Sequence, residues 1–432
     1  MPFSIVCLED IPAAAGTLAL RPSKNLLTGE TALQRKYGTL TTMEIDLLTL
    51  ASSIFACDLA FKRGDREEIT RNISLSVPVV NLAAFESVLD DIIYALFRLS
   101  HDAWTITFVQ KPGVPEPSHR WQATARGKVL LFSGGLDSFA AALQFGNSGE
   151  IVHLISHVTA NQTVSGAQEI LSEYLNKRFP KQFQRTAIRV GGRTTTNFPF
   201  PSDSDREDTQ RTRSFLFLSL AGITARRIGI SDVVVIAENG QLAIHVPLTA
   251  ARISAFSTHT AHPEFIDLMG KILNRLLRYP IEITNPFLYY TKGEVVKDAV
   301  THHSKIVPSA VSCWKASRVS GKNHCGSCIP CLVRRIGIES NGSKIDEYKR
   351  DLLNERILKL SHDDEGKRNL VELAEFVKVF KAEKSKAALL DIYPELNSEY
   401  IDLEKAINMY RRFADEAVNV FDNYPNVKVL LN

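Results

Sequence analysis

The sequence predicts an α/β fold, built on a doubly wound, five-stranded parallel sheet in the middle of the 432-residue chain. Two observations support this prediction. Short apolar runs alternate with helical patterns between residues 127 and 340, as happens when helices cover both faces of a parallel sheet. The first of these runs leads directly into a glycine pair and then a helical pattern, so we expect a tight turn at a strand's carboxyl end. In such sheets ligands bind at that end, where the strand order reverses.

Residues 1–126 have a different pattern and are expected to form an α+β region of their own, without a recognisable chemical motif. Pro78 lies inside a predicted strand of this region. Because proline cannot donate to a β-ladder, that strand is expected at a sheet edge. The expected helices are 41–61 and 81–99, and the expected strands are 73–80 and 104–109.

The central region, residues 127–340, follows a proline-rich stretch at 111–117 that indicates a linker. The expected strands are 129–132, 151–158, 186–190, 232–237 and 281–284, with helices at 138–145, 167–179, 214–228 and 264–277. Residues 341–432 form a wholly helical pattern and are expected to be a C-terminal extension. Its helices are expected at 370–380, 387–392 and 401–421.

Composition narrows the functional class. With 51 Lys and Arg against 48 Asp and Glu the formal charge is +3, which gives no electrostatic reason to expect nucleic acid binding. Hydrophobic residues make up 44% and charged residues 23%, as in ordinary globular proteins. No apolar run approaches the roughly 18 residues of a membrane helix, so no membrane partner is expected. The N-terminus lacks the basic segment of a secretory signal, so we expect a cytoplasmic protein.

A candidate phosphate-binding loop follows the first strand of the central region. Two glycines let backbone N–H groups approach a ligand closely, serine hydroxyls add donors, and the next helix adds partial positive charge at its N-terminus. Asp137 indicates Mg²⁺, because a carboxylate beside phosphate needs a cation between them. A plain turn is the alternative interpretation of the glycine pair. The loop consists of Ser133, Gly134, Gly135, Leu136, Asp137 and Ser138.

Four of the six cysteines lie close together in the sequence, at Cys313, Cys325, Cys328 and Cys331. In a chain without an export signal, this spacing predicts a metal site rather than disulfides. Four thiolates complete the tetrahedral shell of Zn²⁺ and leave no open position, so the site is expected to be structural. An iron–sulfur cluster and independent buried thiols are the alternatives. Neighbouring cations are expected to offset its negative charge, at Lys315, Arg318, Lys322, Arg334 and Arg335.

The loop at 133–138 resembles the SGGxDS motif of the PP-loop ATP pyrophosphatases, which have a HUP-like fold. Together with the Cys-x11-Cys-x2-Cys-x2-Cys pattern, it makes residues 127–340 similar to the QueC family of 7-cyano-7-deazaguanine synthases. The resemblance implies cleavage of ATP between the α- and β-phosphates, with adenylation of a 7-deazaguanine carboxylate. An amine then displaces AMP to give an amide, which the synthase dehydrates to a nitrile with a second ATP.

Two further segments resemble parts of this family. Arg213 to Ser219 is similar to its GRNxxFLS segment, with Ser214 in place of the asparagine, and Thr291 to Val296 is similar to its TKxEI helix start. The candidate catalytic residues are Asp137 of the loop, Arg213 of the first segment and Lys292 of the second. Arg213 is a candidate contact for a phosphate or substrate carboxylate, and Lys292 for stabilising charge on the transferring phosphoryl group. Surface cations are the alternative interpretation of both.

The family's substrate segment, GVNxxDxSGYPDCR, is absent after the fourth strand. In its place, Glu238 and Asn239 are candidates for binding a guanine-like edge, since a carboxylate accepts and an amide both donates and accepts. His259 and His262 are candidates for a phosphate contact or base. A loop turn at Asn239 and ordinary polar histidines are the alternative interpretations.

The flanking regions resemble a branch of the family. QueC-like proteins with such extensions occur in bacterial anti-phage operons, including the Qat and type IV CBASS systems, and the chain looks most like the QatC group. This resemblance implies a C–N ligase whose amine acceptor lies on a partner protein of the same operon, such as a QatB-like protein. A nitrile-forming synthase and a non-catalytic nucleotide-binding scaffold are the alternatives.

Overall fold

The computed structural model describes residues 3–6, 17–64, 70–114, 127–158, 162–229, 234–248 and 260–431. A five-stranded sheet lies at the centre, with the order β11-β10-β6-β7-β8, and all of its described pairs are parallel. The strand order reverses between β6 and β10, as expected for a doubly wound sheet. Its strands are β6 (Lys128–Leu131), β7 (Val152–His157), β8 (Phe183–Ile188), β10 (Val234–Val235) and β11 (Ile283–Thr284).

Helices cover both faces of this sheet, because alternate strand residues point to opposite sides. Leu130 belongs to a buried cluster with α5 (Leu136–Asn147), α6 (Gln162–Arg178) and α10 (Lys292–His302). Val129 and Leu131 belong to another cluster, with α7 (Arg213–Ile228) and α9 (Pro263–Leu277). The buried five-stranded parallel sheet predicted from the sequence is therefore confirmed.

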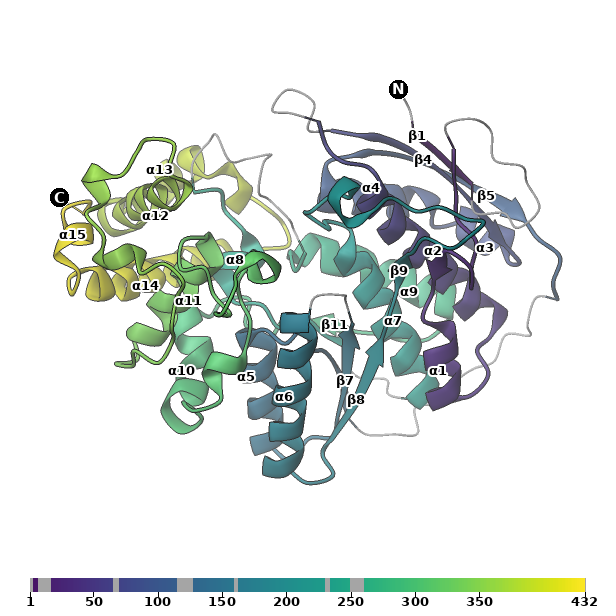
Figure 1. Cartoon of the computed structure of the whole chain (residues 1–432), viewed down its shortest axis with the longest axis horizontal. Coiled ribbons are helices and arrows are strands. Elements are labelled where there is room, and N and C mark those ends of the chain that lie inside the picture. Colours follow the sequence, from purple (N-terminus) through teal and green to yellow (C-terminus); the bar gives the residue numbers. More distant parts are fainter. Residues whose placement is uncertain are drawn as a thin grey trace.

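The N-terminal region contains a four-stranded sheet with the order β2-β1-β4-β5 (Figure 1). Its strands are β1 (Phe3–Val6), β2 (Leu18–Ala19), β4 (Asn72–Val79) and β5 (Ala103–Gln110). Its helices are α1 (Glu30–Tyr37), α2 (Thr42–Ala60), α3 (Leu82–Glu86) and α4 (Leu89–Ser100). Every described strand pair in this sheet is parallel, and the helices α3 and α4 make the crossover from β4 to β5. The α+β class expected for this region therefore needs correction, because that class has a mainly antiparallel sheet.

The edge position expected for the strand with Pro78 is wrong, because β4 lies between β1 and β5. Within the described residues, pairing with β1 ends at Ser76, while Pro78 lies opposite Val109 of β5. Within the described part of the β1–β4 ladder, no hydrogen bond depends on an N–H at Pro78.

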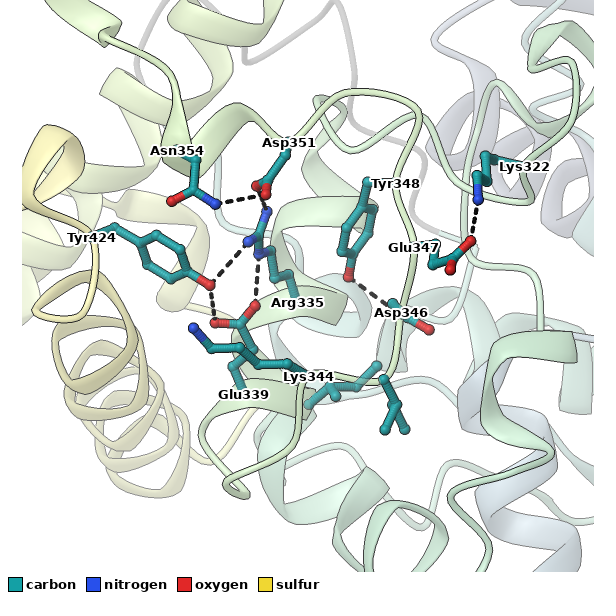
Figure 2. Close-up of a pocket in the computed structure, with 12 residues that line it drawn as sticks. Lys322, Arg335, Glu339, Lys344, Asp346, Glu347, Tyr348, Asp351, Asn354 and Tyr424 are labelled. Carbon is teal, nitrogen blue, oxygen red and sulfur yellow. Dashed lines mark hydrogen bonds and ion pairs between the residues drawn. The ribbon is translucent and has the colours of Figure 1, made fainter.

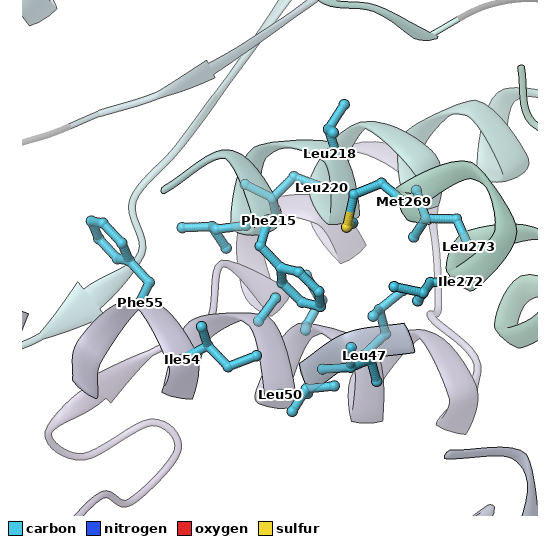
Figure 3. Packing of buried hydrophobic residues seen from close by; sticks show 14 of the residues in the cluster. Leu47, Leu50, Ile54, Phe55, Phe215, Leu218, Leu220, Met269, Ile272 and Leu273 are labelled. Atoms are coloured by element: carbon cyan, nitrogen blue, oxygen red, sulfur yellow. The ribbon is translucent and has the colours of Figure 1, made fainter. Parts of the chain in front are cut away.

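The N-terminal region and the central domain share one hydrophobic core. Figure 3 shows α2 packed against α7 and α9, with Leu47 and Ile54 facing Phe215 and Met269. These side chains are fully buried, so neither region would retain its core alone. A short antiparallel pair also joins the two regions, between β3 (Leu26–Leu27) and β9 (Gly191–Gly192).

The C-terminal region is helical, as predicted, and packs on the other side of the molecule (Figure 1). Its helices pack with α8 (Gly240–Ile244) and α11 (Ile329–Glu339) of the central region in a second buried cluster. They are α12 (Glu365–Ala382), α13 (Lys386–Ile392), α14 (Leu403–Phe421) and α15 (Pro425–Lys428). Among the helices of the described residues, none is both long enough and apolar enough to cross a membrane.

Candidate active site and metal centre

The candidate phosphate loop lies at the carboxyl end of β6, beside the point where the strand order reverses. Gly134 has a φ of +81°, and a Cβ there would lie 3.0 Å from Gln168 Cγ, so the turn favours glycine. The Gly135 N–H donates to Ser133 Oγ over 3.2 Å, and Ser138 Oγ lies 3.3 Å from the same atom. Backbone and hydroxyl donors therefore converge at the N-terminus of α5, as anion binding requires.

Gln168 holds this loop in place, although no pattern in the sequence predicts this role. Its Nε2 donates to the carbonyl of Ser133 over 3.3 Å and to that of His157 over 3.2 Å. Arg185 Nη2 in turn donates to Gln168 Oε1 over 3.0 Å. A glutamine on α6 looks like any polar helix residue in the sequence, and only packing shows that it supports the loop.

Asp137 is the centre of the site and is bonded to two distant segments. Its Oδ1 lies 2.5 Å from Nζ of Lys292, and its Oδ2 accepts from Asn239 Nδ2 over 2.8 Å. All three side chains are buried. The structure therefore unites α5, the segment after β10 and the start of α10 at one edge of the sheet.

Glu238 lies against Asp137 and is hydrogen-bonded to it. The pKa of Glu238 is raised to about 8. Burial is the main cause and the negative charge of Asp137 the second, while the positive charges of Lys292 and Arg213 oppose the shift. A neutral Glu238 carboxyl can donate the bond to Asp137 at neutral pH. The predicted residues Glu238 and Asn239 thus contact the loop carboxylate, and Asn239 has its N–H₂ group committed there rather than to a base edge.

Arg213 is the first residue of α7 and keeps an exposed side chain. Its guanidinium carbon lies 5.4 Å from the centre of the Phe217 ring. Surrounding protein atoms partly desolvate the guanidinium and lower the pKa of Arg213, although solvent reaches this side chain, and the charge of Glu238 partly offsets the effect. The charge of Arg213 therefore acts on the same cluster as Asp137 and Lys292.

The two predicted histidines do not join this cluster in the described residues. His259 lies outside them. His262 is buried at the start of α9, where its ring Nδ1 accepts from the N–H of Glu264 over 3.3 Å. Burial, assisted by the charge of Arg98, lowers the pKa of His262 to about 4. A neutral ring that caps a helix differs from the phosphate contact or base that we expected.

The four predicted cysteines come together as one buried cluster. Their sulfur atoms all lie within 4.8 Å of one another, with 4.0 Å between those of Cys313 and Cys328 and 3.8 Å between those of Cys325 and Cys331. A tetrahedral zinc ion with Zn–S bonds of about 2.3 Å separates its sulfurs by ~3.8 Å. The cluster fits one Zn²⁺, whereas an iron–sulfur cluster would hold the thiolates further apart.

Local backbone groups support this centre. The N–H groups of Lys315 and Cys325 point at Cys313 Sγ over 3.3 and 3.4 Å. Gly326 has a φ of +82°, and a Cβ there would lie 2.0 Å from the carbonyl oxygen of Arg350. The cations expected to offset the thiolate charge each also pair with a carboxylate; the pairs are Lys315–Glu365, Arg318–Asp208, Lys322–Glu347, Arg334–Asp346 and Arg335–Asp351. Of these cations, Lys315 and Arg334 also interact electrostatically with the cysteines.

A cavity of about 390 Å³ lies apart from the phosphate loop, beside α11 (Figure 2). Arg335 is bonded there to Glu339, to Asp351 and to the hydroxyl of Tyr424. Its charged groups therefore satisfy one another. None of the predicted site residues lines this cavity.

A glycine-containing phosphate loop at the switch point of a parallel sheet, followed by a buried Cys₄ cluster, defines a nucleotide-binding α/β protein of the PP-loop type. The sequence model described as "Queuosine biosynthesis protein QueC" matches residues 127–342, half of the chain. The protein belongs to the QueC family, and thereby to the ATP-dependent enzymes of the PP-loop type.

Curated relatives agree with this assignment, and each match covers about half of the chain. The 7-cyano-7-deazaguanine synthase of Campylobacter fetus subsp. fetus is 29% identical over 227 residues, which cover 49% of this chain and 92% of the relative. That of Sinorhizobium fredii is 26% identical over 221 residues, covering 48% and 85%. That of Oceanobacillus iheyensis is 25% identical over 236 residues, covering 51% and 96%.

Proposed function

We propose that this protein uses ATP to adenylate a 7-deazaguanine-type carboxylate and then transfers the acyl group to an amine on a partner protein. The observation that carries this proposal is the grouping of the loop at 133–138 with Lys292 and Arg213 at one edge of the sheet. In this proposal the loop donors bind the departing phosphates, and Lys292 and Arg213 stabilise the charge that develops on the transferring phosphoryl group.

The chemistry has two steps. A carboxylate oxygen attacks the α-phosphorus of ATP, the bond to the bridging oxygen of the β-phosphate breaks, and pyrophosphate leaves with that electron pair. The amine nitrogen then attacks the acyl carbon, loses a proton, and expels AMP to leave an amide. The role of the loop donors and the N-terminus of α5 is to bind the departing pyrophosphate.

The charges of the site suit this ligand. Lys292 neutralises Asp137, and Arg213 adds positive charge beside them. Glu238 is neutral when protonated, so it adds no repulsion toward phosphate below a pH of about 8. The side chains thus favour a polyanion without an excess of negative charge in the cluster.

The donor set also fits Mg²⁺, which prefers carboxylate and phosphate oxygens. Burial and the negative charge of the neighbouring Asp137 both raise the pKa of Glu238, so a cation between the two carboxyl groups would relieve the repulsion. These two residues would hold the ion, which would neutralise phosphate charge there. Lys292 would have to move away from Asp137 Oδ1, its present partner at 2.5 Å.

A macromolecular acceptor is supported by the regions outside the family match, which a small amine would not need. We therefore propose a role like that of the QatC group of anti-phage systems, with a QatB-like protein as the acceptor. The second candidate function is nitrile formation from 7-carboxy-7-deazaguanine, ammonia and ATP. The names of the three relatives, all 7-cyano-7-deazaguanine synthases, favour it.

Product analysis tests both functions. The full chain is incubated with ATP, Mg²⁺ and 7-carboxy-7-deazaguanine, and with either ammonium or the proteins encoded beside it. We expect AMP, pyrophosphate and a protein whose mass increases by the acyl group; a nitrile with ammonium instead would support the synthase function. Asp137→Asn should abolish AMP formation, whereas Asp298→Asn on the exposed face of α10 should not. AMP formation that survives Asp137→Asn would show that the loop is not the site.

A further inference from the structure

The helix that carries Lys292 is held by a residue from the C-terminal region. Thr291 is the N-cap of α10, and its hydroxyl donates a short hydrogen bond to Glu416 Oε1 of α14. The N–H of Gly293 donates to Glu416 Oε2 over 3.3 Å. Both carboxylate oxygens of Glu416 therefore bind the first turn of α10, on either side of Lys292.

This contact requires a close approach of the two helices. A Cβ at Gly293 would lie 2.5 Å from Glu416 Oε1. Arg412, one turn earlier on α14, adds an ion pair with Glu294 over 2.7 Å and donates to the carbonyl of Tyr289 over 2.8 Å. Helix α14 thus fixes the residues before and after the N-cap as well as the N-cap itself.

A second link runs from α14 to Lys292 through Gln241. The Lys292 N–H donates to Gln241 Oε1 over 2.9 Å, and Gln241 Nε2 contacts Met409 Sδ at 2.9 Å. Met409 lies two turns before Glu416 on the same helix. The start of α10 around Lys292 is therefore held in two ways: directly by Glu416, and through Gln241, which contacts Met409. Both Glu416 and Met409 belong to α14 of the C-terminal region.

The helix that carries Arg213 has the same arrangement with the N-terminal region. Thr212 is the N-cap of α7, and Arg213 is the first helical residue. Asp58 of α2 accepts from the Thr212 N–H over 2.8 Å and from the Thr212 hydroxyl over 3.0 Å, both on its Oδ2. Asp58 is 0% exposed and is held in turn by Arg71 over 2.5 Å.

The two carboxylates share three features. Each comes from outside residues 127–342, the segment that matches the family. Each binds the threonine directly before a cation of the candidate site. Each places carboxyl oxygens at a helix N-terminus, where the groups of the first turn need hydrogen-bond acceptors. A carboxyl group that accepts from the N-cap threonine thus holds the start of both cation-bearing helices. One carboxyl comes from the N-terminal region and the other from the C-terminal region.

We propose that Asp58 and Glu416 are positioning residues, which fix the starts of α7 and α10 so that Arg213 and Lys292 hold the geometry that the reaction needs. This inference rests on the proposed function and deepens it. The flanking regions then complete the active site, in addition to any role in binding a partner. Misplacing a catalytic group by about 1 Å can lower a rate by about 10²-fold, so removal of either carboxylate should act mainly on kcat.

The test compares Glu416→Ala and Glu416→Gln with Asp415→Ala in the full chain. Asp415 is the adjacent residue on α14, but it is exposed and binds Lys381 at the surface. We expect Glu416→Ala to lower kcat for AMP formation at least 10-fold with little change in KM for ATP. The glutamine variant can still accept from Thr291 and should recover part of the loss. Asp415→Ala should match the wild type.

A matched pair tests the other helix. Thr212→Val removes the hydroxyl that donates to Asp58, whereas Thr224→Val removes a buried hydroxyl further along α7, which donates to the carbonyl of Leu220 over 2.8 Å. Both changes are similar in size. We expect Thr212→Val to lower kcat and Thr224→Val to leave it unchanged. The loss in Thr212→Val should be only several-fold, because Asp58 still accepts from the backbone N–H at position 212.

Hydrogen exchange gives a readout that does not depend on activity. The amides of residues 291–294 should exchange faster in Glu416→Ala than in the wild type or in Asp415→Ala. Unchanged exchange in a folded variant would overturn the positioning role, and so would faster exchange with an unchanged kcat. If the wild type forms no AMP, the proposed function fails, and exchange alone then decides whether Glu416 holds the helix start.

Discussion

Lys292 Nζ lies 2.5 Å from Asp137 Oδ1, which joins the first turns of two helices that are 155 residues apart in the sequence. Both side chains are buried, at 3% and 8% exposure. In a buried ion pair each charge compensates the other, because the protein interior offers neither water nor another counter-ion. Removing one partner therefore leaves an uncompensated buried charge, which destabilises the fold. The pair is therefore a structural element as well as a candidate catalytic one.

This relationship predicts a non-additive effect on stability. Lys292→Met keeps the apolar stem but leaves Asp137 uncompensated, and should lower the free energy of unfolding by about 3–5 kcal/mol. Adding Asp137→Asn should restore most of the loss, measured by urea denaturation. The exposed pair Lys271–Asp267 is the control, since solvent screens it and Lys271→Met should leave stability nearly unchanged. Additive losses at the buried pair would contradict this account.

The zinc assignment predicts that metal and fold are coupled. The purified chain should contain one zinc ion and no iron by elemental analysis. Cys328→Ser replaces a thiolate at the N-cap of α11 and should lower both the zinc content and the melting temperature. A strong chelator should have a similar effect on the wild type. Stoichiometric iron with a visible absorbance band would sink the zinc assignment.

Gly326 should be indispensable for the metal centre, for a steric reason. Its φ is +82°, and a Cβ would lie 2.0 Å from the carbonyl oxygen of Arg350. Gly321 is a matched control, since its φ is +75° but nothing lies within 4 Å of its would-be Cβ. We expect Gly326→Ala to lower zinc content and melting temperature far more than Gly321→Ala. Equal effects would show that backbone strain, not the clash, dominates.

Glu416 predicts a specific pH dependence of stability. The pKa of Glu416 is raised from 4.5 to about 7, mainly by burial and in smaller part by the charge of Glu294. The hydrogen bonds from Thr291 and Gly293 and the charge of Arg412 oppose this shift. A carboxyl whose pKa is raised by folding stabilises the protein when protonated. This contribution is full below a pH of 4.5 and is lost as the pH rises to about 7, by no more than ~3 kcal/mol.

The measurement is urea denaturation of wild type and Glu416→Gln across that pH range. The wild type should lose stability relative to the variant as the pH rises, because glutamine does not ionise. Parallel curves for the two proteins would mean that Glu416 titrates at its ordinary pKa.

The shared core predicts that the family-matched segment does not fold properly alone. Without α2, the apolar side chains of Phe215, Met269 and Leu273 would be exposed to water. A fragment of residues 127–342 should therefore aggregate or bind a hydrophobic dye, as measured by gel filtration and dye fluorescence. Phe215→Ala in the full chain should lower the free energy of unfolding by about 3–5 kcal/mol. A monomeric fragment with cooperative unfolding would contradict this view.

Much of the fold could be predicted because its signals are local. The strands of the central sheet and the helices between them follow from runs of apolar residues and their period. The loop at 133–138 and the four cysteines were readable from spacing alone, since each motif is contiguous or nearly so. Pro78 shows the limit of such rules, because its strand lies between β1 and β5, although a proline predicts an edge position.

The sequence by itself determined the parallel sheet, the phosphate loop and the metal ligands, because short stretches of chain carry the backbone turns and ligand spacings that these features require. The tertiary structure alone decided that Asn239 binds Asp137 and that His262 caps a helix. It also decided that Asp58 and Glu416 secure the two cation-bearing helices. Apart from the His262 cap, these contacts join residues more than 100 positions apart, and they depend on how the helices pack, which no local pattern specifies.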